Sequence, residues 1–141
     1  MNDGVKLDSS VLSDFQNKLM KEIVDKFPYD VEIFLKQNAK NLRTNALKSA
    51  KAQTKKKTGN YYKGYKISRA FTGNGRGFIK TYNNAPHSHL IEYGHKKWIH
   101  GKDTGETIKG KYILTAAAIK YIPEYYINAE KFLREYFEKK L

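Results

Sequence analysis

The side chains best suited to acid–base or metal chemistry are four histidines within a stretch of fourteen residues. They are His87, His89, His95 and His100, and Glu92 lies among them. On a strand, His87 and His89 would point to the same face. Their spacing matches no standard zinc motif, and Gly94 would interrupt the strand. We therefore expect no metal site and no bound cofactor.

A small nuclease toxin is the enzymatic alternative for the same residues. His87 or His89 would be the base, Glu92 the acid, and Lys66 or Arg69 would bind a phosphate. The surrounding basic interval contains no carboxylate pair that could hold magnesium, and the chain has no cysteine for thiolate catalysis. We therefore expect that the protein is not an enzyme.

The positive charge of the chain is concentrated in one interval. The formal net charge is +13, and no Asp or Glu lies between Glu32 and Glu92, whereas 13 of the 27 Lys and Arg residues do. The 14 other basic residues balance the 14 acidic ones, so the rest of the chain is neutral. One face or edge of the fold should carry a strong positive potential. Its partner could be nucleic acid, an acidic protein surface or an acidic patch on a neighbouring copy.

The most basic part of this interval lies at the end of an expected helix. One interpretation is a solvated helix end, where cations also suit the helix dipole. The other is a contact surface for a polyanion. The residues concerned are Lys48, Lys51, Lys55, Lys56 and Lys57.

The length and hydropathy indicate the general class of protein. A chain of 141 residues is typical of a single domain, 1–141, with a modest core. No apolar run approaches the roughly 18–20 residues that cross a bilayer, so we expect no membrane association. The lack of cysteine fits synthesis in a reducing cytosol.

Helical periodicity frames the chain at both ends. Residues 1–9 should be flexible, and residues 10–57 should form two helices, about 10–27 and about 30–53, separated by Pro28. Residues 112–141 predict a C-terminal helix with a kink or a restart at Pro123.

The middle of the chain favours β-structure. Within residues 58–95 we expect strands at about 61–71, 78–82 and 89–93, and then a loop over 96–111. That loop would be a functional arm or a mobile excursion, and Trp98 would pin it to the core or wait for a partner. Glu92 would form an ion pair with a strand lysine or arginine, or with a neighbouring subunit. The expected fold is α+β: a small antiparallel sheet of three to four strands packed against two N-terminal helices and a long C-terminal helix.

Three short motifs resemble a family of tailed-phage proteins. They are Lys57-Thr58-Gly59-Asn60, then Ala85-Pro86-His87 with Ile91-Glu92-Tyr93-Gly94-His95-Lys96, and finally Gly110-Lys111-Tyr112-Ile113-Leu114. Their order and spacing over about residues 30–140 are similar to those of the neck or tail-component proteins of long-tailed bacteriophages, the gene-product-ten-like family. Tyr62 and His87-Ser88-His89 depart from the residues common in that family.

The resemblance implies a virion structural protein that acts in head–tail joining or tail completion. It implies contacts with other neck and tail proteins, a homo-oligomeric ring, contact with DNA in transit, and a place in the virion after synthesis in the bacterial cytoplasm. A basic nucleic-acid-binding module remains the main alternative. We expect the interfaces at three places: the basic helix end named above, the corner formed by Glu92, Tyr93 and His95, and the loop with Trp98.

Overall fold

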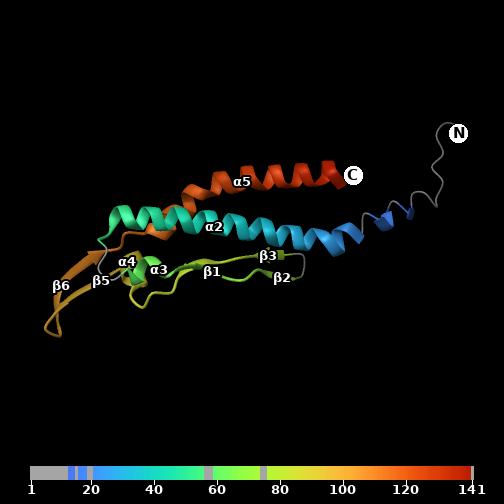
Figure 1. Cartoon of the computed structure of the whole chain (residues 1–141). Helices are drawn as coiled ribbons and strands as arrows, with labels where there is room; N and C mark the ends of the chain where they lie inside the picture. Colours follow the sequence, from blue (N-terminus) through green and yellow to red (C-terminus); the bar gives the residue numbers. More distant parts are fainter. Residues whose placement is uncertain (1–12, 15, 19–20, 56–58, 74–75, 141) are drawn as a thin grey trace.

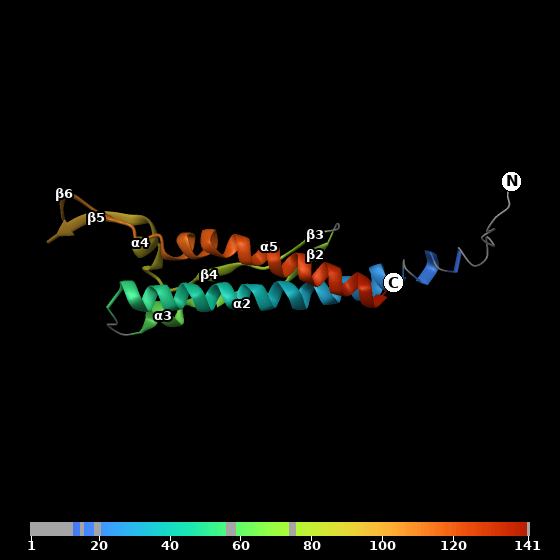
Figure 2. The same cartoon turned by 90° about the horizontal axis from the view of Figure 1, so that it is seen from above.

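The fold is an elongated α+β arrangement built around two long antiparallel helices (Figure 1). The computed structural model describes residues 13–14, 16–18, 21–55, 59–73 and 76–140. Helix α2 (Phe27–Gln53) lies beside helix α5 (Ile113–Lys140), and a long hairpin runs along another side of α2. A second hairpin extends beyond the end of α2, away from the C-terminus, as both views show (Figures 1 and 2).

The expected break at Pro28 is wrong. A π-helical turn, η1 (Glu22–Lys26), leads directly into α2, and Phe27 keeps a right-handed helical backbone. Pro28 lies in the first turn of α2, where the missing N–H costs little because such groups have no partner within the helix. Residues 1–9, which the sequence predicts to be flexible, and the start of the expected first helix lie outside the described residues.

The long hairpin replaces part of the expected sheet. Its base is strand β1 (Tyr65–Ile67) paired with β4 (Thr81–Asn83), and its tip is β2 (Phe71–Gly73) paired with β3 (Arg76–Phe78). Both pairs are antiparallel. The described residues therefore form two-stranded sheets rather than one sheet of three or four strands.

Two expected strand segments are helical instead. Residues 60–63 form a short helix, α3 (Asn60–Lys63), after Gly59 takes a left-handed backbone with φ +82°. The expected third strand is helix α4 (Ser88–Tyr93). The β-propensity of the tyrosines is overridden because the helical turn packs Tyr61 and Tyr62 against the core under α2.

The expected loop over 96–111 is a hairpin, which we call the arm. It consists of β5 (Gly94–Ile99) and β6 (Lys102–Lys109), paired antiparallel with an irregularity between Lys96 and Trp98. His100 and Gly101 connect them with φ +50° and +76°. Two successive left-handed residues suit the right-handed twist of a two-residue hairpin turn. Every residue of β6 is exposed, so the arm gains little support from the body.

Helix α5 does not restart at Pro123. The proline lies inside one continuous helix, so of the two expected outcomes, a kink or a restart, the restart is wrong. The proline removes the hydrogen bond to the carbonyl of Ile119. Ile119 is exposed, so water can reach this position, and the rest of the helix packs on both sides of the proline.

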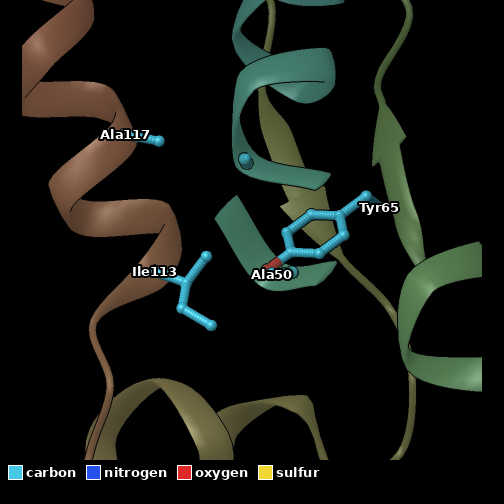
Figure 3. Close-up of a cluster of buried hydrophobic side chains, with 5 residues drawn as sticks. Ala50, Tyr65, Ile113 and Ala117 are labelled. Carbon is cyan, nitrogen blue, oxygen red and sulfur yellow. The ribbon is translucent and has the colours of Figure 1, made fainter. Parts of the chain in front are cut away.

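The core is small and lies where α5 begins against the end of α2. Ala46 and Ala50 of α2 let Ile113 and Ala117 of α5 approach closely, and Tyr65 closes the cluster from β1 (Figure 3). Ile113 is the largest side chain that is fully buried in the described part of the chain. The other end of the helix pair is held by aromatic rings, which include Phe27, Phe34, Phe132 and Tyr136.

Candidate interaction surfaces

The carboxylate of Glu92 caps the N-terminus of α5. Oε1 accepts a hydrogen bond from the backbone N–H of Leu114 at 2.9 Å. Oε2 accepts the backbone N–H of Thr115 at 3.0 Å and its hydroxyl at 2.6 Å. These N–H groups have no partner within their own helix, and a negative charge is favoured there. This cap, supplied from α4 by a buried side chain, stands in place of the expected ion pair with a strand lysine or arginine.

Two glycines allow the backbone segments at this junction to approach closely. A Cβ on Gly110 would lie 2.4 Å from the carbonyl oxygen of Glu92, and a Cβ on Gly94 would lie 2.4 Å from that of Ile108. Gly94 also has a left-handed backbone, φ +85°. The close approach allows backbone hydrogen bonds from Lys111 to Ile91 and from Tyr112 to Glu92. The motif residues Glu92, Gly94 and Gly110 thus share one structural task, which is to join α4, the arm and α5.

A pair of tyrosines lies beside this junction. The hydroxyls of Tyr61 and Tyr65 are 2.6 Å apart. Burial raises the pKa of Tyr65, and the hydrogen bond with Tyr61 and the charge of Glu92 act in the same direction. Burial also raises the pKa of Tyr61, although the hydrogen bond with Tyr65 opposes that shift. Both phenols are therefore neutral at ordinary pH, and they line a small cavity of about 220 Å³ together with Glu92.

The histidines do not converge. His87, at the N-cap of α4, and His89, within α4, are exposed. His95 is half-buried on β5 opposite Ile108, and His100 is exposed in the turn of the arm. Among the described residues, no group of three His, Asp or Glu side chains is placed to hold a metal ion.

The basic end of α2 lies on the surface. Lys48, Lys51 and Lys55 are exposed, whereas Lys56 and Lys57 lie outside the described residues. On the side facing α5, Lys48 borders a shallow groove together with Lys120 and Glu124.

Two other expected contact residues are exposed, one at the end of α4 and one on the arm. Tyr93 is exposed at the end of α4, with its ring edge-on to Tyr112 at a centroid distance of 6.0 Å. Trp98 is 59% exposed near the tip of the arm, so it does not pin this segment to the core.

A larger apolar surface lies along α5, and the sequence patterns did not point to it. A groove of about 420 Å³ has α2 as its floor, with Leu35 and Leu42 exposed to it. One wall is formed by the long hairpin and the other by α5; the wall residues include Phe78, Ile79, Ile122, Tyr125 and Tyr126. The groove could have been predicted from the number of apolar residues on α5, which exceeds what one buried face needs. A second apolar face therefore remains after the face towards α2 is buried.

Exposed apolar residues of this kind are typical of proteins that assemble with other proteins. A family model described as "Bacteriophage HK97-gp10, putative tail-component" matches residues 13–94. The chain belongs to this family of phage tail components, and the family supports a phage structural role. Comparisons with curated proteins and with solved structures found no match. Within the described residues, no helix has the length and hydropathy needed to cross a membrane.

Proposed function

We propose that the protein is a non-enzymatic neck or tail-completion component that joins phage heads and tails through protein–protein contacts. Family membership supports the phage structural role, and the exposed apolar surface supports the mode of action. Sixteen large hydrophobic residues in the described part are at least about a third exposed, against eight buried hydrophobic residues in the core. An isolated monomer rarely exposes so much apolar surface without a partner.

The partners that we propose are other neck and tail proteins and further copies of the chain in a ring. A ring needs two different complementary surfaces on each subunit. The chain offers the arm at one end and the α5 groove along the body. The assembled protein would lie in the virion, after synthesis in the host cytoplasm.

Electron microscopy of a lysate from a phage with this gene deleted tests the proposal. Separate filled heads and complete tails would place the protein at the joint, and tails of abnormal length would place it in tail completion. Normal particles in the deletion lysate would contradict the structural role. A plasmid copy of the gene should restore joined particles, which controls for effects on neighbouring genes.

Nucleic-acid binding is a second candidate because the exposed lysines of α2 lie close together near the C-terminal end of this helix. If they bind DNA, affinity should fall steeply with salt, by a log–log slope of about −0.9 for each phosphate neutralised. Replacing Lys48, Lys51 and Lys55 by Glu should then abolish binding. Binding that is weak and insensitive to salt would exclude this candidate and favour the protein–protein role.

A further inference from the structure

We propose that the tip of the arm of one copy inserts into the α5 groove of a second copy. This inference rests on the proposed assembly role for its setting. It adds the two surfaces that meet and the residues that carry the contact.

The tip of the arm carries two exposed apolar side chains. Trp98 and Ile99 are neighbours on β5, directly before the His100–Gly101 turn, and both are exposed. Neighbouring residues on a strand point to opposite faces, so each face of the tip carries one apolar side chain. Its paired residue on β6 is charged: Asp103 opposite Trp98, and Lys102 opposite Ile99. A flat partner could cover only one of these side chains, whereas a groove with two walls can cover both.

The α5 groove has this shape and chemistry. Tyr126 and Ile122 stand on the α5 side, Phe78 on the hairpin side, and the leucines of α2 form the floor. All three wall residues are substantially exposed. Aromatic walls provide large contact area at a low cost in side-chain entropy.

The arm of the same chain does not supply this occupant. The arm extends beyond the end of α2, away from the body (Figures 1 and 2). The groove residues instead lie within the two long helices, between positions 35 and 42 of α2 and between 118 and 126 of α5. The contact must therefore join different surfaces of two copies. A reciprocal exchange of arms would give a two-fold dimer, whereas a one-way contact closes rings or grows filaments.

The size of the contact predicts how tightly copies associate. Burial of an aromatic side chain removes about 150–250 Å² from water, and a stable interface needs about 800 Å² from each partner. One arm therefore provides only part of a stable interface. Two copies should associate weakly, and association should strengthen when each copy both gives and receives an arm.

The absence of native cysteine allows a direct test. Ile99→Cys and Tyr126→Cys variants of the full chain are mixed and oxidised, and covalent dimers are resolved by mass. We expect dimers that contain one chain of each variant. The control mixes Ile99→Cys with Ile127→Cys, because Ile127 is 67% exposed, close to the 68% of its neighbour Tyr126, but does not line the groove.

The same contact is measured without crosslinking by sedimentation of the full chain over a range of concentrations. Trp98→Ala and Tyr126→Ala should each weaken association by about tenfold or more, as expected of central aromatic contacts. Thr107→Ala on the arm and Ile127→Ala on α5 should leave it unchanged. Circular dichroism shows whether each exposed-site variant keeps its helices.

Three results would overturn the proposal. They are dimers formed only between two Ile99→Cys chains, equal crosslinking to positions 126 and 127, and a chain that stays monomeric at all concentrations. The first would mean that two arms pair with each other. None of these results bears on the phenotype of the gene deletion, so the proposed assembly role stands or falls separately.

Discussion

Glu92 holds Thr115 by two hydrogen bonds to one carboxylate oxygen, from the backbone N–H at 3.0 Å and the hydroxyl at 2.6 Å. This contact joins α4 to the first turn of α5 across 23 positions of sequence. The arm leaves the body directly after this contact, at Gly94, and returns to it at Gly110. The cap therefore fixes both the start of α5 and the base from which the arm projects.

Replacing Glu92 by Ala should lower the free energy of unfolding by about 2–3 kcal/mol, because charged hydrogen bonds to buried helix N–H groups are lost. Urea unfolding followed by circular dichroism measures it. Glu106→Ala is the control, since Glu106 is an exposed partner of Lys97 and should contribute under about 1 kcal/mol. Equal losses for the two variants would mean that Glu92 is an ordinary surface carboxylate.

Gly110→Ala should destabilise the protein by about 2 kcal/mol or more, because the new Cβ would overlap the backbone of Glu92 and Gly94. Gly105→Ala provides the comparison. Gly105 has φ +79° but no atom within 4 Å of the position that a Cβ would take. Substitution there should therefore cost only the strain of a left-handed backbone, about 1–2 kcal/mol. The two melting temperatures decide the point. A milder effect at Gly110 than at Gly105 would contradict the close approach.

Stability should fall at alkaline pH because of Tyr65. Burial raises the pKa of its phenol in the folded state. Its contribution is therefore fully present below the ordinary phenol pKa of about 10 and is lost as the pH rises above that value. Between about pH 8 and about pH 11, the free energy of unfolding should fall less for the Tyr65→Phe variant than for the natural chain. Identical pH profiles would mean that Tyr65 ionises freely in the folded protein.

A polar network fixes how α2 and α5 align. The amide oxygen of Asn38 accepts the hydroxyl of Tyr121 at 2.6 Å and the amide of Asn128 at 3.0 Å. Asn38→Ala should cost about 2 kcal/mol because it leaves these donors without their acceptor. Combined with Tyr121→Phe, the total cost should be less than the sum by about 1 kcal/mol. Additive costs in this double-mutant cycle would show that the two side chains act independently.

The periodicity of apolar residues predicted the long helices, because α2 and α5 present repeating faces over many turns. It failed for α4, since a six-residue segment with Leu90 and Ile91 fits a strand as well as a helix. It also failed at Pro28, because a proline is compatible with the first turn of a helix.

The candidate surfaces were predicted only in part. The sequence correctly marked Lys48 and Lys51 as exposed, whereas for Trp98 it left a core contact and an exposed position equally open. It could not show that Glu92 meets Thr115, because that contact depends on the position of α4 against α5. The α5 groove was missed for the same reason, since its floor and two walls come from three separate segments of the chain.

The central claim is that this protein completes the junction between heads and tails, and complementation in vitro tests it most directly. Purified protein is added to the lysate of the deletion phage, and infectious particles are counted. We predict that the natural chain restores infectivity, that Ile127→Ala does so equally, and that Trp98→Ala restores much less. A lysate that is fully infectious before addition would contradict the claim, and so would one in which heads and tails stay separate after it.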